Sequence, residues 1–134
     1  MPDDVALNKL AIIERCLRRV AEEYQGQPAR LENFTVQDSI VLNVQRACEA
    51  AIDMAMHVVA KRRLGVPQDA RSAFELLAVE RVIDRELAER MKLMVGFRNI
   101  AIHEYQQLQN GILQRILEER LADLPRLARQ LLKA

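Results

Sequence analysis

Apolar residues recur along most of this chain at alternating spacings of three and four positions, the period of an α-helix with one buried face. The longest run predicts a helix from Thr35 to about Arg63, which stops before Gly65 and Pro67. Its apolar positions are Ile40, Val44, Ala47, Ala51, Met54 and Val58. At about 1.5 Å per residue it spans roughly 40 Å, so we expect it to form the centre of the fold.

Shorter amphipathic segments flank this long helix. They are predicted at residues 3–24, at 72–78, from 84 onward and from 107 to 132. Their apolar positions are, in order, Leu7, Leu10, Ile13, Leu17 and Val20; Phe74, Leu77 and Ala78; Leu87, Met91 and Met94; and Ile112, Ile116, Leu117 and Leu121. Pro125 lacks an amide hydrogen, so it should begin a new turn or kink the last segment. We therefore predict an all-α fold, an antiparallel bundle of four to five helices in a single domain over residues 1–134.

Two of the helix starts carry capping signals. Thr35 precedes Asp38 by three residues, and Ser72 precedes Glu75 by three. This spacing is typical of a capping box, in which a hydroxyl and a carboxylate satisfy the first free amides of a helix. We therefore expect Thr35 and Ser72 to be N-cap residues.

The composition supports helices and excludes several other classes. Only 4 Gly, 4 Pro, 3 Phe and 2 Tyr occur in 134 residues, which argues against collagen-like, disulfide-rich and all-β proteins. The net charge of +1 indicates no particular class of partner. The basic residues are 16 Arg and 4 Lys. Arginine favours bidentate contacts with phosphate or carboxylate, although a high-GC genome accounts for the same excess.

The chain shows no sign of membrane insertion or secretion. No apolar run approaches the roughly 18 residues that a membrane span needs. Residues 1–4 are acidic and are not followed by the apolar core of a signal peptide. Cys16 and Cys48 lie inside helical patterns and lack the spacing of a metal-binding pair, so we expect reduced, buried thiols. Together these features predict a cytoplasmic protein.

Chemistry is concentrated in the segment Gly96–Tyr105. The apolar line that includes Met91 and Met94 reaches Arg98 at its next step. A charge on a core-facing line is costly unless it is paired or opens onto a cleft. Arg98 is therefore the first indication of a functional site.

Helical geometry relates the other polar residues of this segment to Arg98. Asn99 and His103 lie about 40° apart around a helix, and Arg98 and Tyr105 about 20° apart on a neighbouring face. Arg98 and His103 are about 140° apart in a straight helix. The length of the arginine side chain, a distortion at the helix end or a second copy of the chain would each bring them together. A purely structural interpretation is a satisfied histidine and an arginine that pairs with Glu104 or with backbone carbonyls.

Arg98, Asn99, His103 and Tyr105 form the pattern R-N-x-x-x-H-x-Y. This pattern resembles the signature of the HEPN superfamily and, within it, of the HepT-like toxins of toxin–antitoxin pairs. The likeness extends to the long helix at residues 44–55, to the block at 72–77 and to Gly96-Phe97. It covers residues 5–132, essentially the whole chain.

The resemblance implies a metal-independent endoribonuclease without a cofactor. RNA supplies its own nucleophile, the 2′-hydroxyl, so the protein needs only to move protons and stabilise charge. His103 suits proton transfer because histidine titrates near neutrality. Arg98 suits the charge that develops on the phosphorane, and Asn99 suits orienting His103 or the phosphate. The expected products are a 2′,3′-cyclic phosphate (or a 3′-phosphate) and a 5′-hydroxyl. The lack of a carboxylate cluster for Mg²⁺ agrees with this chemistry, and we expect no metal site.

The resemblance also implies partners. Family members generally form homodimers in which both motifs face a shared cleft, and a minimal nucleotidyltransferase serves as the antitoxin. In such systems the residue at Tyr105 receives AMP from that partner; the alternatives are packing or a site-lining role, such as stacking on a base. Bound RNA also needs a basic surface, for which Arg46 and the run Lys61, Arg62 and Arg63 are candidates.

Two acidic residues and two other functions complete the interpretation. We expect Glu49 and Asp53, near the polar face of the long helix, to be solvated or ion-paired. The first alternative function is a non-catalytic HEPN bundle that acts as the substrate-binding or regulatory subunit of a nucleotidyltransferase. Such proteins often lack the Arg–His pair, so the presence of Arg98 and His103 favours the enzyme. The second alternative, a purely structural helical dimer, leaves Arg98 unexplained.

Overall fold

The computed structural model describes residues 3–103 and 110–134, and over these ranges its regular structure is entirely helical. Six α-helices and one 3-10 helix occur there, in the order α1 (Asp4–Tyr24), η1 (Pro28–Glu32), α2 (Phe34–Lys61), α3 (Ala70–Val79), α4 (Arg85–His103), α5 (Asn110–Glu119) and α6 (Asp123–Leu132). The predicted all-α fold is confirmed. The predicted helix at 84 and beyond is α4, and the last predicted segment consists of two helices, α5 and α6.

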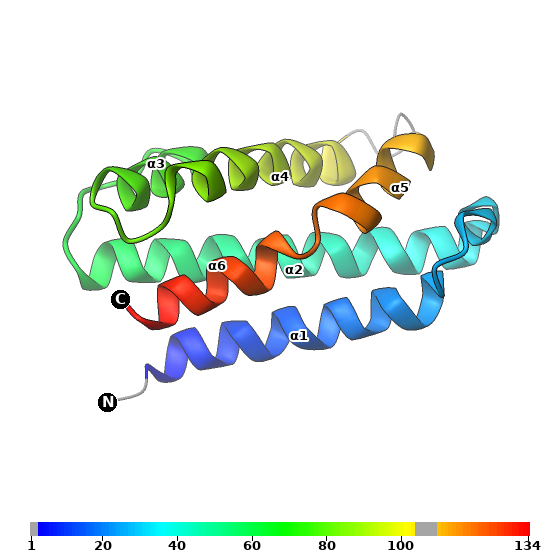
Figure 1. The fold of residues 1–134 in the computed structure, drawn as a ribbon, viewed down its shortest axis with the longest axis horizontal. Coiled ribbons are helices and arrows are strands. Elements are labelled where there is room, and N and C mark those ends of the chain that lie inside the picture. The colour runs from blue at the N-terminus through cyan, green and yellow to red at the C-terminus, as the bar shows by residue number, and fades with distance from the viewer. Residues whose placement is uncertain (1–2, 104–109) are drawn as a thin grey trace.

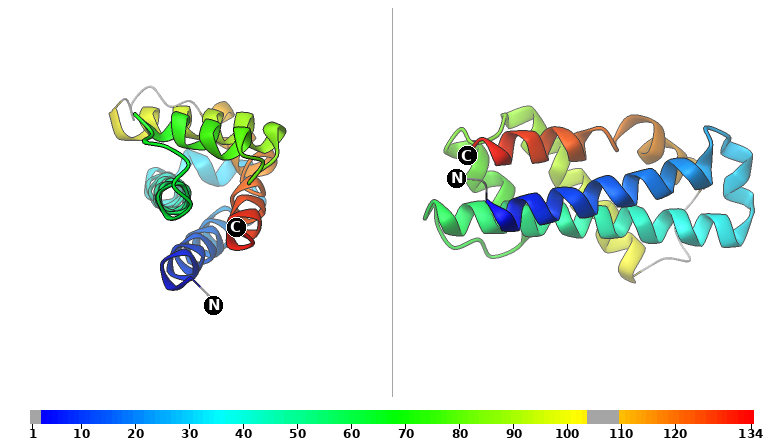
Figure 2. Two further views of the ribbon diagram at one scale, coloured as in Figure 1. Left: turned by 90° about the vertical axis from the view of Figure 1, so that its left-hand side faces the viewer. Right: turned by 90° about the horizontal axis from the view of Figure 1, so that it is seen from below.

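The long helix α2 lies at the centre of the molecule (Figure 1). α1 packs antiparallel along it, α6 lies against both, and α3 and α4 cover another side of α2. α4 crosses α2 obliquely, so that its C-terminal end projects beyond α2 on the side away from α6 (Figure 2). The helix that carries the candidate site residues therefore leaves the bundle as it reaches them.

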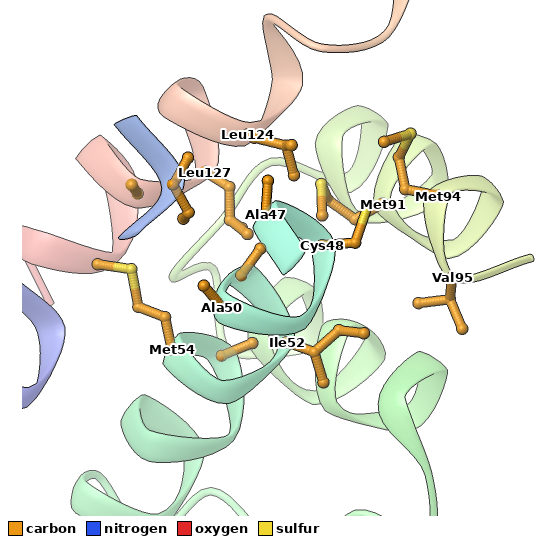
Figure 3. Packing of buried hydrophobic residues seen from close by; sticks show 14 of the residues in the cluster. Ala47, Cys48, Ala50, Ile52, Met54, Met91, Met94, Val95, Leu124 and Leu127 are labelled. Carbon is orange, nitrogen blue, oxygen red and sulfur yellow. The ribbon is translucent and has the colours of Figure 1, made fainter. Parts of the chain in front are cut away.

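The predicted stripe of α2 forms the core. Its six apolar positions are buried, with exposed fractions between 0 and 2%: Ile40, Val44, Ala47, Ala51, Met54 and Val58. Cys48 extends this core toward Met91 of α4, as Figure 3 shows, and each is only 1% exposed. Cys16 is also buried, and both cysteines are free thiols, as predicted. Each large apolar side chain buried in this way stabilises the fold by about 1.5–3 kcal/mol.

Both predicted capping boxes are wrong in register. α2 is capped by Asn33, whose side chain accepts a hydrogen bond from the Val36 amide at 3.2 Å, so Thr35 already lies inside the helix. α3 is capped by Asp69, which accepts from the Ser72 amide at 2.8 Å while the Ser72 hydroxyl bonds to the Asp69 backbone. In each case an Asn or Asp with extended backbone stands before the predicted residue. Such residues are equally good caps, and the backbone path decides between them.

The C-terminal helices close the bundle. Pro125 is the third residue of α6, where its missing amide hydrogen costs no helical bond, so it starts a new helix and does not kink one. Arg90 of α4 holds this junction: its Nε donates to both carboxylate oxygens of Asp123 at 2.8 and 2.9 Å, and Nη2 donates to the Glu119 carbonyl at 3.0 Å. Asp123 is only 4% exposed.

One predicted core position of α5 is wrong. Ile112 is 45% exposed, whereas its neighbour Leu113 is fully buried together with Ile116. Both Ile112 and Leu113 fit a helical spacing to Ile116, so the period alone does not distinguish them. Among the residues described here, no helix is both long and apolar enough to cross a bilayer.

Candidate functional site

Arg98 lies on the core-facing line of α4, as predicted. Met91 and Met94, on the preceding turns, are buried, whereas the Arg98 side chain is 22% exposed. Its Nη1 donates to Oε1 of Glu49 on α2 at 2.8 Å. The charge on the core-facing line is thus balanced by a carboxylate from the neighbouring helix.

The Arg98 guanidinium is only partly satisfied by this pair. Its Nε is buried and has no hydrogen-bond partner in the part of the chain that the structure describes. Buried donors without acceptors are rare, because leaving one unpaired costs about 1–3 kcal/mol. The Glu49 pair thus leaves one buried donor of the guanidinium unsatisfied among the described residues.

The backbone of α4 is helical without interruption from Arg85 to His103. The angle of about 140° between positions 98 and 103 therefore persists, and no break within this helix brings them together. Asn99, the residue directly after Arg98, is half-buried. The backbone of His103 ends α4, its side chain is not among the described atoms, and Tyr105 lies outside the described residues. The catalytic roles of Arg98, Asn99 and His103 thus stay predictions.

Cys48 adjoins Glu49 but does not provide a nucleophile. The pKa of the Cys48 thiol is raised to about 12, mainly by burial. The negative charge of Glu49 adds to this increase, and the positive charge of Arg98 offsets a smaller part of it. At neutral pH the thiol is protonated and therefore unreactive. The chemistry of this site does not use the cysteine.

The four predicted RNA-contacting residues separate into two places. Arg46 is exposed on α2, one turn before Glu49, and so lies beside the Arg98 pair. Lys61, Arg62 and Arg63 are also exposed but lie at the end of α2, about 18 Å along its axis from Glu49. Lys61 is further engaged by Asp3 at 3.2 Å. Contact with RNA stays a prediction for all four.

The acidic residues of α2 are ion-paired, which is one of the two states expected for them. Glu49 pairs with Arg98, and Asp53 pairs with Lys9 of α1 at 3.2 Å. The sequence contained no signal for the Glu49 contact, because its partner is 49 residues away and only the packing of α4 on α2 joins them. Among the described residues, no three His, Cys, Asp or Glu side chains are grouped so as to hold a metal ion.

The chain's other histidine has a structural partner. His57 Nε2 lies 2.7 Å from Oδ2 of Asp3, whose Oδ1 accepts from the Ala6 amide and caps α1. The Ala6 amide first, and then His57 and Lys61, hold the pKa of Asp3 well below its usual range. This cluster joins the start of α1 to the end of α2 and lies away from Arg98.

Comparison with known proteins gives consistent matches over nearly the whole chain. A family model described as "Ribonuclease HepT-like" matches residues 10–131. The chain is 42% identical over 121 residues to the mRNA nuclease HepT of Shewanella oneidensis, an alignment that covers 90% of this chain and 91% of that one.

Solved structures agree with this match. A crystal structure of a toxin–antitoxin with AMP-PNP superposes with a TM-score of 0.92 at 38% identity, covering 98% of this chain and 100% of the other. The tri-AMPylated HEPN toxin of Shewanella oneidensis in complex with its MNT antitoxin gives a TM-score of 0.92 at 39% identity, covering 98% and 99%.

Proposed function

The chain belongs to the ribonuclease HepT-like family, and from this we propose that it is the toxin of a toxin–antitoxin pair, an endoribonuclease that cleaves RNA with Arg98, Asn99 and His103. The observation that carries the proposal is the Arg98 guanidinium, held on the core line by Glu49 at 2.8 Å with its Nε unpartnered. It stands five residues before His103 on one continuous helix.

The reaction needs no nucleophile from the protein. The 2′-oxygen of the RNA forms a bond to the adjacent phosphorus, and the bond from phosphorus to the 5′-oxygen breaks. The 2′-hydroxyl proton passes to a base, and a proton is delivered to the leaving 5′-oxygen. His103 performs one or both transfers in this proposal. The products are a 2′,3′-cyclic phosphate and a 5′-hydroxyl, and neither a metal nor a cofactor takes part.

Arg98 supplies the fixed positive charge. Nη1 is occupied by Glu49, so the guanidinium is held in one orientation, and the buried Nε has no hydrogen-bond partner among the described residues. A donor that is already oriented stabilises the charge of the phosphorane without a cost of reorganisation. Glu49 is, in this proposal, the positioning residue that holds Arg98.

A homodimer completes the site. Arg98 and position 103 face different sides of α4, and α4 projects beyond α2 (Figure 2). Leu42, two turns from Glu49 on α2, and Ile102, one turn beyond Arg98 on α4, are 42% and 43% exposed. These two apolar side chains flank the ion pair, and a second copy of the chain would cover them.

The oligomeric state tests the dimer. We expect light scattering coupled to gel filtration to give twice the chain mass for the wild type. The double variant Leu42→Glu and Ile102→Glu should elute as a monomer with an unchanged helical circular-dichroism spectrum, because both side chains are already exposed. A monomeric wild type, or a variant that stays dimeric, would contradict this assignment.

The partner is a minimal nucleotidyltransferase, and both proteins act in the cytoplasm. Two supports are the family match and the similar toxin that was solved in its AMPylated form with an MNT antitoxin. In the proposed modification the Tyr105 oxygen forms a bond to the α-phosphorus of ATP, pyrophosphate leaves and the phenolic proton is lost. The added phosphate puts negative charge near Arg98, where the substrate phosphate must bind.

Growth of cells that express the chain without its neighbouring gene tests the ribonuclease. The wild type should arrest growth and degrade RNA, whereas His103→Ala and Arg98→Ala should do neither. A harmless wild type that leaves RNA intact would refute the ribonuclease and favour the non-catalytic subunit. If both variants are as toxic as the wild type, the site is assigned wrongly.

Intact mass after co-expression with the nucleotidyltransferase tests the modification. We expect one or more AMP-sized increments on the wild type and none on Tyr105→Phe. Unmodified wild type, in cells whose growth the partner restores, would show that the antitoxin acts by binding alone.

A further inference from the structure

Arg71, in the first turn of α3, reaches across to α4. Its Nε lies 3.4 Å from the carbonyl oxygen of Lys92. Its Nη2 lies 3.2 Å from the point that a Cβ at Gly96 would occupy, and among the described residues outside the backbone of α4 no other atom comes within 4 Å of that point. The absence of a side chain at Gly96 therefore lets this guanidinium approach α4 a few tenths of an ångström more closely.

Gly96 marks the face of α4 that leads to position 103, about 160° around the helix from Arg98. Gly96 and position 103 are seven residues apart, so they lie within about 20° of each other and about 10 Å apart along the axis. Asn99 lies within about 60° of the same line. α3 packs on this face of α4 between Arg85, which pairs with Glu75 of α3, and Gly96, which Arg71 of α3 approaches. Arg71 thus lies at the end of the α3–α4 contact that is nearer to position 103.

Arg71 differs from its neighbours because it has no close carboxylate. Arg85 and Lys92 both pair with Glu75 and Glu89 along the α3–α4 contact. Arg71 is exposed and has no carboxylate within 4.0 Å among residues 3–103 and 110–134. It stands at the N-terminus of α3, where the helix dipole disfavours a cation. Its charge acts at longer range on the N-cap: Ser72 first, and then Arg71, lower the pKa of Asp69.

We propose that Arg71 binds a backbone phosphate of single-stranded RNA on the face of α4 that leads to position 103, where Gly96 leaves room for its guanidinium. The proposal rests on the proposed ribonuclease and deepens it by assigning a substrate-binding residue outside the R-N-x-x-x-H-x-Y pattern. Arg71 Nη1 and Nη2 present a planar pair of donors that matches two phosphate oxygens. RNA offers such a phosphate at every nucleotide, so this contact positions the strand without selecting a base.

Binding of a fluorescent single-stranded RNA to His103→Ala protein, measured by anisotropy at several salt concentrations, tests Arg71 without cleavage. Arg71→Gln should raise the Kd about two- to fivefold. The slope of log K against log salt should become shallower by about 0.7, the value for one phosphate contact on a single strand. Arg71→Lys should recover most of the affinity. The matched control Arg129→Gln, an exposed arginine of α6 in a helical turn, should bind like the parent.

A second series of variants tests the contact between the Arg71 guanidinium and Gly96. Gly96→Ala should weaken RNA binding less than Arg71→Gln does, because the added Cβ moves the guanidinium by only a few tenths of an ångström. It should not lower the melting temperature, because alanine favours the helix. In an Arg71→Ala background the same change should have no further effect.

These outcomes separate the two proposals. If Arg71→Gln leaves both the Kd and the salt slope unchanged, or if Gly96→Ala weakens binding fully in the Arg71→Ala background, the Arg71 contact is wrong. If otherwise wild-type protein fails to cleave RNA while Arg71→Gln still weakens binding, the ribonuclease is wrong and the RNA contact stands.

Discussion

The ion pair between Arg98 and Glu49, at the place where α4 crosses α2, has two effects. The pair is partly buried, with side-chain exposures of 22% and 38%. It balances a charge on the core line and holds the guanidinium at one nitrogen while another stays unpartnered. Stability and proposed chemistry therefore depend on the same contact.

Removing the carboxylate of Glu49 should affect both properties. We expect Glu49→Ala to lower the free energy of unfolding by about 1 kcal/mol, because Arg98 is left without a partner. RNA cleavage should fall about tenfold, mainly in kcat, because Arg98 is no longer held in place. Urea unfolding and steady-state kinetics measure the two effects. The matched control is Asp53→Ala on the same helix, whose exposed pair with Lys9 should contribute little to either. Equal effects of both variants would show that Glu49 has no special role.

Burial of the two cysteines predicts inert thiols. Cys16 and Cys48 are each 1% exposed, and the pKa of Cys48 is raised to about 12. At pH 8 a thiol reagent such as DTNB should label neither residue in the folded protein and both in denaturant. Rapid labelling of native Cys48 would contradict the packing of α2 against α4, and rapid labelling of native Cys16 would contradict its burial in the core.

The pairing of α3 with α4 depends on a charge network centred on one carboxylate. Arg85 binds Glu75 at 2.6 Å and Lys92 binds it at 2.6 Å, and both also reach Glu89. These groups are partly exposed, so the energy of each pair is small and screened by salt. The network still sets the register between the two helices, and with it the position of Arg71.

This network predicts a specific dependence of stability on pH. Arg85 first, and then Lys92, lower the pKa of Glu75 to about 2 from its usual value of 4.5. Because the folded-state pKa is depressed, the stabilisation is complete above pH 4.5 and is lost as the pH falls toward 2. Glu75→Gln should be less stable than the wild type at pH 7, and the difference should shrink across this window. Melting curves at each pH measure it, and a difference that does not change with pH would refute the effect.

At the level of the helix, the sequence predicted which helices exist and where they begin and end better than it predicted their N-cap residues. α1 and α2 begin and end within two residues of their predicted limits, because long amphipathic patterns specify a face clearly. The caps Asn33 and Asp69 were missed because Thr35 and Ser72 fit the same local rule. In α5, Ile112 and Leu113 fit the period equally, and only the direction of packing buries Leu113. Local chemistry leaves such choices to the tertiary structure.

At the scale of the whole molecule, the junction of α5 and α6 is held by Arg90 and Asp123. Asp123 is almost fully buried, and Arg90 bonds to both of its carboxylate oxygens as well as to the Glu119 carbonyl. Truncating Asp123 leaves a partly buried arginine without its anion. Arg90 therefore joins the α5–α6 junction to α4, in addition to Arg126 of α6, which pairs with Glu86 of α4 at 3.5 Å.

Loss of this pair should destabilise the entire bundle. We expect Asp123→Ala to lower the free energy of unfolding by about 2 kcal/mol, which urea denaturation measures. Arg115→Ala, which removes an exposed pair with Glu119 at 3.7 Å, should change it by less than about 0.5 kcal/mol. If Asp123→Ala proves as stable as Arg115→Ala, the pair does not hold the C-terminal helices.

The candidate site could be predicted from the sequence only in part. Arg98 was identified because a charge interrupts an apolar line, which is a local property of α4. Its pairing with Glu49 and the contact of Arg71 with Gly96 were not predicted, because both contacts join helices that meet only in the folded bundle. The residues proposed to perform chemistry can thus be read from one helix, whereas those that hold them in place come from its neighbours.

The separation of Glu49 and Arg98 by 49 residues also sets the order in which the protein becomes active during synthesis. α1 and α2 adjoin in sequence and can pair as a hairpin while the rest of the chain is still unmade. The ion pair forms only after α4 has left the ribosome and crossed α2, close to the end of translation. The proposed cationic centre is therefore assembled only late in the synthesis of the chain, after the α1–α2 hairpin.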